Sequence, residues 1–522
     1  MTTTTTTRFQ SSVSGARDGF TRLVHAEWTK FRSVRRWTLG MLAMAALTVG
    51  MGLFIASGSG TDANSHPEEL TIGPDGTRVQ DVFQFTHRPL RGDGTVTARV
   101  TSLKSVDGGT TAGWAKAGVI IKAGTRPGST YAAVMVTPGH GVRLQSDFTK
   151  DVAGESRAIP GWLRLVRSGT SVTGYESADG RTWREVGTVK LPKLPQRAEV
   201  GLFTTSPGII KVQREFGKTA AGQTTSVVSA TFDSVSVQNQ QQPPQPAQPA
   251  QPPQPGQPGQ QAVPWTHTAV GPSAKGGDEF QGSENAGTFT LRGLGDIAPR
   301  SADDDPVRLA FTGVIIGMIA AVALGVLFIT AEYKRGMIRT SFAAGPRRGR
   351  VLAAKAIVIA AVTFAAGLAA AVVLFYVSQP VLRSGGFAPP TYPEPSLADP
   401  PVMRAVAGTA LFLAMVAVLG LGVGAILRRS AGAIAGVVSL LVLPVVIASA
   451  LPVSAATWMM RLTPAAGMSI QQTGTTYPQV ENVCLPEDGC YYSEPWAGIG
   501  VLAAYTAAAL GVAYWLLRRR DA

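Results

Sequence analysis

The stretch LAFTGVIIGMIAAVALGVLFITA, residues 309–331, contains no charged residue, and EYKRGMIRTSFAAGPRRGR, residues 332–350, follows it directly. A helix needs about 20 consecutive apolar residues to cross the hydrocarbon core of a bilayer, so the first part is long enough to span a membrane. The second part combines Lys and Arg with Gly and Pro, which is typical of a basic loop retained on one side of the membrane. Together the two segments predict a membrane protein.

Five more charge-free windows occur, at residues 37–60, 356–382, 405–427, 430–460 and 495–517. Windows of this length argue against a soluble helical bundle, and charged residues form only 15% of the 522-residue chain. Pro444 and Pro452 break the fifth window, because proline kinks or ends a helix. We expect six spans, at residues 37–58, 308–331, 351–378, 403–427, 431–452 and 495–517.

Basic residues are concentrated in alternate connections between these spans. They lie before the first span, in residues 332–350, at Arg428 and Arg429, and after the last span at 518–520. Because Lys and Arg are retained on the cytoplasmic side, we expect both termini in the cytoplasm and residues 61–307 outside the cell. The first apolar run could also be a signal peptide, since ASGSG follows it, but its length favours a retained anchor.

Residues 61–238 have the alternation of β-strands. VFQFTHR (82–88), GTVTARVTSL (94–103) and WLRLVRSG (162–169) alternate in a two-residue period, and Gly, Pro or Asp interrupts the series at short intervals. This pattern is typical of an all-β sandwich. The fold class is therefore a multi-pass α-helical membrane protein with an all-β sandwich inserted between the first two spans.

The segments WAKAGVIIKAG, YAAVMVTPGHGVRLQ and GYESADGRTWREVG resemble a concanavalin-like, laminin-G-like (regulation-of-enolase-like) jelly-roll domain, over roughly residues 80–238. The resemblance implies a sugar-associated domain, but the carboxylate cluster of its glucanase relatives is missing. Glu176 and Asp179 lie instead in an Asp-Gly hairpin signal, with Trp183 packing beneath it, so we expect no catalysis. Four aromatic residues could stack on a glycan, although filling the core is the simpler role for them. They are Tyr131, Trp162, Tyr175 and Trp183.

Residues 239–262 are rich in Pro and Gln, which excludes helix and sheet and predicts an extended segment. Strand-like sequence resumes at residues 263–300, which resemble the segment that normally begins the same sandwich. We expect GTFTLRG (287–293) to pair back onto the sandwich, as in a circular permutation, which makes the Pro-rich segment a loop rather than a tether. At the other end of the chain, residues 1–19 are predicted to be a disordered tail.

Cys484 and Cys490 lie in CLPEDGC, within the expected outer loop at residues 453–494. Oxidation is permitted outside the membrane and the short spacing can close a small ring, so we expect a disulfide; a free redox pair is the alternative. The cysteines and the scattered histidines form no metal-site pattern, and we expect no metal.

EYKRGMIRTSFAAGPRRGRVLAAK (332–355), HAEWTKFRSVRRW (25–37) and RLTPAAG (461–467) resemble parts of ABC type 2 transporter permeases, the six-span subunits of many exporters. The resemblance covers roughly residues 22–58 and 306–520, and the large insert departs from the minimal family plan. It implies that the loop 332–350 is a coupling helix that docks on a separate ATPase. ATP and Mg would then be held by that partner, and this chain would need no cofactor.

The loop residues assigned to ATPase coupling are Glu332, Tyr333, Arg335, Gly336, Met337, Ile338, Arg339 and Phe342. Met337, Ile338 and Phe342 would be the apolar contacts, while Arg339 and Glu332 could pair across the interface. The simpler alternative is a basic loop that only sets the topology. The resemblance also implies an interfacial helix at residues 20–36, and a flank of a signal anchor is its alternative. The residues expected at the membrane interface are Trp28, Lys30, Arg32, Arg347 and Arg348.

These observations predict the membrane subunit of an ABC exporter that is not itself an enzyme, since the chain lacks a phosphate-binding loop. The expected partners are an ABC ATPase subunit, a second permease copy and membrane lipid, with a cell-wall glycan as a further candidate and no nucleic acid. The alternative is a membrane-anchored surface-binding or sensory protein whose sandwich is the active module.

Overall fold

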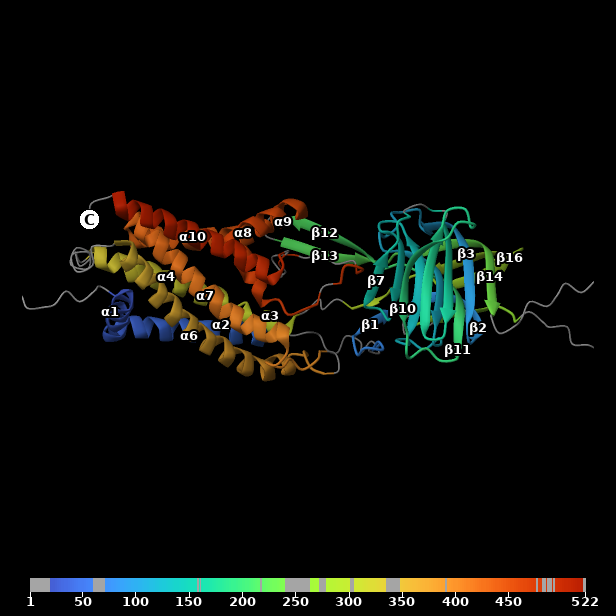
Figure 1. Ribbon diagram of the computed structural model, residues 1–522, viewed down its shortest axis with the longest axis horizontal. Helices are drawn as coiled ribbons and strands as arrows, with labels where there is room; N and C mark the ends of the chain where they lie inside the picture. The colour runs from blue at the N-terminus through green and yellow to red at the C-terminus, as the bar shows by residue number, and fades with distance from the viewer. Residues whose placement is uncertain are drawn as a thin grey trace, which may run out of the picture. The chain divides into compact units, whose positions relative to one another are not determined.

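The computed structural model describes residues 19–59, 71–156, 159, 161–215, 218–239, 263–271, 278–300, 305–334, 348–389, 392–475, 477–480, 485, 491 and 493–519. The chain forms two compact units (Figure 1). The helical unit contains residues up to Ala63, Asp304–Thr473 and residues from Cys484 onward. The sandwich unit contains Asn64–Asp303 and a short later segment, Gly474–Val483.

The helices of the helical unit follow the apolar windows of the sequence. They are α1 (Phe20–Ser33), α2 (Arg35–Gly58), α3 (Pro306–Phe311), α4 (Val314–Lys334), α6 (Arg348–Ser384), α7 (Pro400–Leu427), α8 (Ser430–Ala448), α9 (Val453–Leu462), the 3-10 helix η2 (Pro464–Gln471) and α10 (Pro495–Arg519). Among the described residues, six helices are long and apolar enough to cross a membrane, namely α2, α4, α6, α7, α8 and α10. The predicted six-span helical protein with an inserted β-sandwich is confirmed.

Several helix boundaries differ from those expected, and prolines lie at these places. The third span was expected to end at residue 378, but α6 continues to Ser384 with Pro380 inside it. The expected outer loop begins instead with helix α9, whose N-cap is Pro452, and with η2, which has Pro464 in its first turn. Proline is tolerated at the start of a helix because its missing N–H would have no intrahelical acceptor there.

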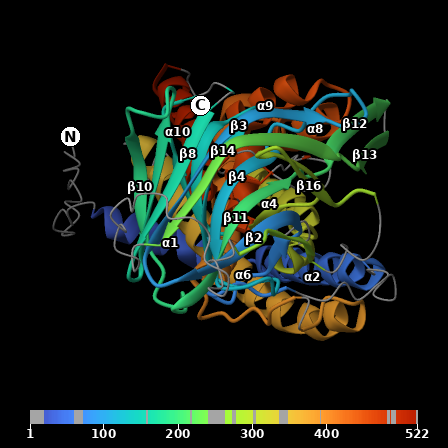
Figure 2. The same cartoon turned by 90° about the vertical axis from the view of Figure 1, so that its right-hand side faces the viewer.

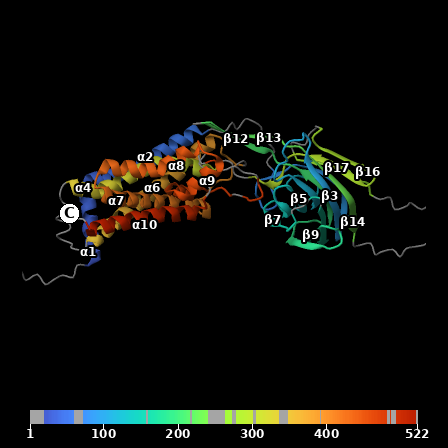
Figure 3. The same cartoon turned by 90° about the horizontal axis from the view of Figure 1, so that it is seen from above.

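The spans α4 and α7 are the most buried, whereas only 28% of the apolar window is buried in each of α2, α8 and α10. A Cβ on Gly325 of α4 would lie 1.9 Å from the carbonyl oxygen of Ala417, so the backbones of α4 and α7 touch only because Gly325 has no side chain. The first helix, α1, lies across one end of the bundle (Figures 1 and 3).

The sandwich unit is built from short strands. These are β1 (Val79–Asp81), β2 (Phe83–Arg91), β3 (Gly94–Ser105), β4 (Lys116–Lys122), β5 (Tyr131–Thr137), β6 (Gly141–Ser146), β7 (Lys150–Ala153), β8 (Gly161–Ser168), β9 (Ser171–Ser177), β10 (Arg184–Lys190), β11 (Arg197–Thr205), β12 (Ile209–Glu215), β13 (Lys218–Thr224), β14 (Val228–Asn239), β15 (Thr266–Val270), β16 (Gln281–Asn285), β17 (Thr288–Gly293) and β18 (Ile297–Pro299).

Two seven-stranded antiparallel sheets face each other across an apolar core (Figure 2). The strand order is β10-β9-β8-β3-β14-β17-β16 in one sheet and β15-β2-β11-β4-β5-β6-β7 in the other. The segment after the Pro-rich stretch contributes to both sheets, because β17 pairs with β14 and β15 pairs with β2. Phe289 and Leu291 of β17 are buried in the core. The segment that follows the Pro-rich stretch therefore supplies strands to both sheets.

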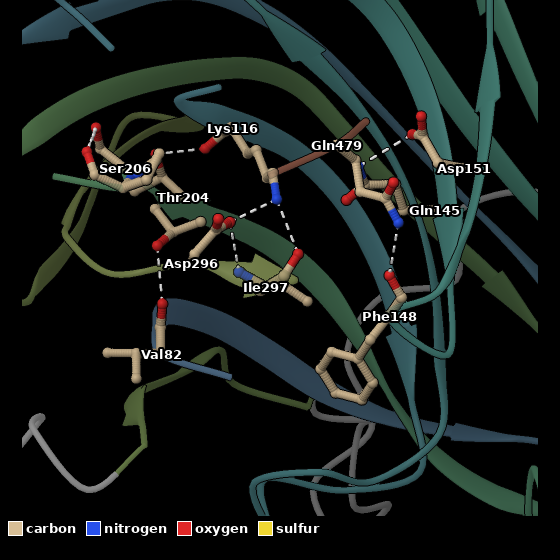
Figure 4. Close-up of polar contacts among 12 residues, drawn as sticks. Val82, Lys116, Gln145, Phe148, Asp151, Thr204, Ser206, Asp296, Ile297 and Gln479 are labelled. Carbon is tan, nitrogen blue, oxygen red and sulfur yellow. Dashed lines mark hydrogen bonds and ion pairs between the residues drawn. The ribbon is translucent and has the colours of Figure 1, made fainter. Parts of the chain in front are cut away.

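A third layer covers the other face of the β15–β7 sheet. The short β1–β18 pair lies there, with Phe83, Phe85 and Tyr131 in a second apolar cluster. Two fully buried lysines project into this layer and each binds an aspartate: Lys116 binds Asp296, and Lys122 binds Asp81 at 2.7 Å. Figure 4 shows Lys116 bonding both Asp296 and the carbonyl oxygen of Ile297.

The segment Gly474–Val483, which follows η2 in the sequence, also belongs to the sandwich unit. Gln479 is only 2% exposed, and its Nε2 donates to the carbonyl oxygen of Phe148 at 3.2 Å (Figure 4). The same Nε2 also donates to the carbonyl oxygen of Thr149 at 3.3 Å. These acceptors lie in the β6–β7 turn, where Asp147 and Phe148 have positive φ. A side chain from between the last two spans thus completes the hydrogen bonding of a sandwich turn.

Candidate functional site

The ends of several spans meet at the end of the helical unit where α1 lies. The guanidinium carbon of Arg428, between α7 and α8, lies 5.2 Å from the ring centre of Tyr333 at the end of α4. Arg348, at the start of α6, donates to the carbonyl oxygen of Leu517 near the end of α10, at 3.1 Å. The basic residues that the sequence places at alternate span ends are therefore gathered at one end of the unit.

Most of the predicted coupling loop lies outside the described residues. This applies to Arg335, Gly336, Met337, Ile338, Arg339, Phe342 and Arg347. The structure does describe both ends of the loop, Glu332 and Tyr333 in α4 and Arg348 in α6. The assignment of the loop to ATPase coupling stays a prediction.

Glu332 does not face outward as the sequence analysis expected. Its side chain is buried, and its Oε1 accepts from Lys355 of α6 at 2.6 Å and lies 3.5 Å from Nζ of Lys30 of α1. The other carboxylate oxygen, Oε2, is buried with no hydrogen-bond partner among the described residues. The expectation that this carboxylate pairs with a partner subunit across an interface is corrected, because the carboxylate already binds lysines of its own chain.

Lys355 is the centre of a buried ionic cluster. It is 1% exposed and donates to two carboxylates, those of Glu332 and of Glu27 of α1, the latter at 2.7 Å. The aromatic ring of Phe328 lies 5.0 Å from its Nζ. Charges are rarely buried in membrane proteins unless they pair within the bundle, and here three helices supply the partners. Glu27, Lys30, Glu332 and Lys355 are called the ionic cluster below.

Lys30 forms the water-facing edge of the ionic cluster. Its Nζ lies 2.9 Å from Oε1 of Glu27, and its side chain is nearly half exposed. Partial burial lowers the pKa of Lys30, but the hydrogen bond and charge of Glu27, together with Glu332, outweigh this and raise the pKa above its usual value. Lys30 therefore stays positively charged, which leaves two cations and two carboxylates in the cluster.

The remaining residues of α1 fit an amphipathic helix. Glu27 and Phe31 are buried, whereas Trp28, Lys30 and Arg32 are exposed. Trp28 is 43% exposed and stacks on Phe31 with ring centres 6.2 Å apart. Such a helix presents aromatic and basic side chains on one side while it packs on the bundle with the other.

Sequence reasoning missed Glu27 and Lys355. Lys355 lies one residue before the charge-free window that begins at residue 356, so it was not counted as a charge within a span. Glu27 shares helical spacing with Val24 and Phe31, and a carboxylate within that apolar stripe was a detectable signal. No local pattern could reveal that the two side chains meet.

On the sandwich, three of the four predicted glycan-contact residues share one face of a sheet. Arg164 of β8 is paired across the strands with Tyr175 of β9, so the two side chains lie on the same face. The guanidinium carbon of Arg164 is 3.7 Å from the ring centre of Trp183, and Trp162 lies two residues before Arg164 on the same strand. The three aromatic side chains are half-buried on the outer face of the sheet.

Tyr131 lies elsewhere and is fully buried. It belongs to β5 in the other sheet, beneath the β1–β18 layer, and its ring packs against Phe148 with centres 4.9 Å apart. Burial and the charge of Asp81 raise the pKa of its hydroxyl well above the usual value. A ligand cannot reach this ring, so the interpretation of Tyr131 as a glycan contact is corrected.

Glu176 and Asp179 line a cavity of about 410 Å³ beside the β9–β10 hairpin. Both carboxylates accept backbone N–H groups, Glu176 from Glu155 and Asp179 from Arg181 and Thr182. The hydrogen bonds from Thr182 and Arg181 lower the pKa of Asp179, so it is ionised and cannot act as a general acid near neutral pH. The two side chains hold the hairpin in shape.

The other predicted sites stay open. Cys484 and Cys490 lie outside the described residues, so the disulfide is still a prediction. Within the described part of the chain, no group of three or more His, Cys, Asp or Glu side chains could hold a metal ion.

Comparisons with known proteins give the family. A model of the ABC-2 family transporter proteins matches residues 209–522, which is more than half of the chain. The chain therefore belongs to the ABC-2 family: it is a multi-pass permease subunit of an ABC transporter. Membership implies that it associates with an ABC ATPase subunit and leaves catalysis to that partner.

No curated protein matches the chain. Among solved structures, it is similar to a functionally unknown protein from Saccharomyces cerevisiae, with 15% identity and a TM-score of 0.23, covering 33% of this chain and 82% of that one. It is also similar to SCP-B, a member of the eqolisin family of peptidases in complex with the tripeptide Ala-Ile-His. That match has 8% identity and a TM-score of 0.24, and covers 41% of this chain and 98% of that one. At these scores neither structure bears on function.

Proposed function

We propose that this chain is the permease subunit of an ABC exporter, with both termini in the cytoplasm and residues 61–307 outside the cell. The observation that carries the proposal is the gathering of basic span ends, such as Arg348 and Arg428, around the ends of the loop between α4 and α6. Lys and Arg are retained on the cytoplasmic side of a membrane, so this end would face the cytoplasm, where ATPase subunits work.

In this proposal the loop 332–350 is the coupling helix that docks on the ATPase. Met337, Ile338 and Phe342 would supply apolar contacts, with Gly336 and Pro346 bending the chain on either side. The chain would act as a homodimer or heterodimer of permease copies with two ATPase subunits. ATP and Mg would bind to those subunits, and their cycle would alternate the spans between inward-open and outward-open states.

Co-purification with a candidate ABC ATPase subunit tests the proposal. The wild-type chain in detergent should retain the ATPase, and Arg339→Glu or Gly336→Pro should lose most of it, because the first reverses a charge and the second blocks a helix at the docking surface. Trp183→Ala, in the sandwich, is the control that should bind the ATPase like wild type. If wild type retains no ATPase, or the loop variants retain as much as the control, the coupling assignment is wrong.

For the sandwich we propose a concanavalin-like jelly roll with an accessory, glycan-binding role at the outer face of the membrane. Trp162, Tyr175 and Trp183 share one sheet face with Arg164, and aromatic rings of this kind stack on sugars. Binding of the full chain to purified cell-wall glycan should weaken in Trp183→Ala. If the variant and wild type bind the glycan equally, the proposed glycan-binding role is wrong.

A further inference from the structure

The ionic cluster lies between the two helices that enter and leave the loop 335–347. Glu332 is two residues before the end of α4 at Lys334, and Lys355 is seven residues after the start of α6 at Arg348. Their side chains meet at 2.6 Å. Any movement of the loop that rotates or slides α4 against α6 must therefore change this contact.

The same lysine also holds α1. Nζ of Lys355 lies 2.7 Å from Oε2 of Glu27, and the opposite oxygen of Glu27 binds Lys30 one helical turn further along α1. Only Val34 separates α1 from the span α2 (Arg35–Gly58). Movement of α4 or α6 at the cluster is thus passed to α1 and then along the chain to the first span.

Stability alone is a poor explanation for such a cluster. Removing charges from water costs free energy that their mutual attraction only partly returns, and apolar groups of similar volume often stabilise a protein as well or better. The cluster is also incompletely bonded, because Oε2 of Glu332 is buried without a hydrogen-bond partner among the described residues. The Glu332 carboxylate has one unbonded oxygen and two lysines nearby, Lys30 and Lys355, so a second arrangement of the contacts is available to it.

We propose that Glu332 is a positioning residue that changes partner during the transport cycle. In the arrangement described here it binds Lys355 closely and Lys30 at 3.5 Å. When the ATPase moves the loop, the contact with Lys355 lengthens and that with Lys30 shortens, so that α1 follows the loop. This inference rests on the proposed function, since it requires an ATPase that moves the loop.

The test compares two variants in the complex with the ATPase. The triple variant Glu27→Gln, Glu332→Gln, Lys355→Met removes the buried charges together, which avoids leaving one uncompensated ion in the interior. The matched control, Lys116→Met with Asp296→Asn, removes a buried ion pair in the sandwich instead. The readout is the hydrogen exchange of α1 amides in the nucleotide-free complex and in the complex trapped with ATP and vanadate.

In wild type and in the control, we expect trapping to change the exchange rate of α1 on the order of fivefold. In the triple variant, the difference between the two states should vanish while the ATPase still co-purifies. A purely structural role would instead raise α1 exchange equally in both states and leave their ratio intact. The inference is overturned if α1 of the triple variant responds to trapping as wild type does, or if wild-type α1 does not respond at all. Failure of wild type to bind the ATPase would overturn the proposed function itself.

Discussion

The two units both bury lysines against carboxylates, but they do so in different ways. In the sandwich, Lys116 and Lys122 each have one aspartate, and backbone groups add further bonds: Lys122 also donates to the carbonyl oxygen of Ser129, and Oδ2 of Asp81 accepts from the N–H of Gly128, while Oδ1 of Asp81 is buried without a hydrogen-bond partner among the described residues. In the helical unit, Lys355 is shared by two carboxylates, one oxygen of which is unsatisfied within the described residues.

The difference lies in what surrounds the charges. The sandwich lysines both project from β4, which is hydrogen-bonded along its length to β11 on one side and to β5 on the other. The ionic cluster joins three helices, two of which border a loop. We therefore expect the same chemistry to fix the structure in the sandwich and, as proposed for Glu332, to form an adjustable connection in the helical unit.

Deletion of Trp265–Ile297 should have the largest effect. It removes β15, β16, β17 and Asp296, the partner of Lys116. Loss of one buried phenylalanine such as Phe289 costs about 3–5 kcal/mol, and a whole domain is stable by only about 5–15 kcal/mol, so we expect the sandwich to unfold. Loss of hydrogen-exchange protection in β2 and β14 of the purified chain would show it. Wild-type protection in the deleted chain would mean that the returning strands are dispensable.

Lys122→Met should come next. It leaves Asp81 buried beside apolar rings without its cation, and breaking a buried pair in this way costs about 3–5 kcal/mol. The urea midpoint of the sandwich, followed by exchange at β4 and β5, measures the loss. Adding Asp81→Asn should recover much of it, because the uncompensated charge is gone. A midpoint that is equally low in the double variant would point to packing of the lysine stem instead.

Lys355→Met should cost less than Lys122→Met, about 2 kcal/mol, because Lys30 remains 2.9 Å and 3.5 Å from the two carboxylates. The melting temperature of the detergent-purified protein gives the comparison. If Lys355→Met proves the more damaging of the two, the ionic cluster is the rigid element and the contrast between the units is reversed.

Gln479→Leu tests an uncharged contact in the same sandwich unit. It removes two hydrogen bonds to the β6–β7 turn, and we expect a loss of about 1–2 kcal/mol. Protease sensitivity of the segment Gly474–Val483 in the full chain should rise, since Gln479 no longer holds it. Unchanged cleavage would show that other contacts keep the segment in place.

The smallest effect is expected at Arg99 and Asp233, a pair with substantial exposure on both sides. Arg99→Gln should cost little stability, as is usual for exposed pairs. The hydrogen bond from Arg99 lowers the pKa of Asp233 below its ordinary 3.8. The contribution of the pair is therefore complete above about pH 4 and is lost as the pH falls through the lower folded pKa. The difference in urea midpoint between wild type and variant should shrink with acidification; a constant difference would contradict this assignment.

Much of the architecture could be predicted because its signals are local. The charge-free windows identify all six spans, and two-residue alternation identifies strands such as β3 and β8. Span ends were less predictable: α6 tolerates Pro380, and Val453–Leu462 forms a helix rather than part of a loop. Tertiary packing decides such ends, because a proline inside a helix is tolerated when its neighbours satisfy the freed carbonyl group.

The candidate site was less predictable than the fold. Glu332 was recognised as a residue of interest, but its side chain was expected to face a partner subunit and is buried instead. Tyr131 was named as a candidate glycan contact, with the core as the simpler role, and only its full burial decides for the core. A position in a sequence pattern does not say which neighbour a side chain meets.

The sequence by itself determined the number of spans, the inserted sandwich and the basic character of alternate connections, because the length, alternation and charge of short segments are enough for these. Only the tertiary structure decided that Lys355 meets Glu27, 328 positions away, and that Gln479 closes a turn of the sandwich 331 positions before it. Such contacts depend on how whole helices and sheets pack, and packing brings together residues between which no local pattern exists.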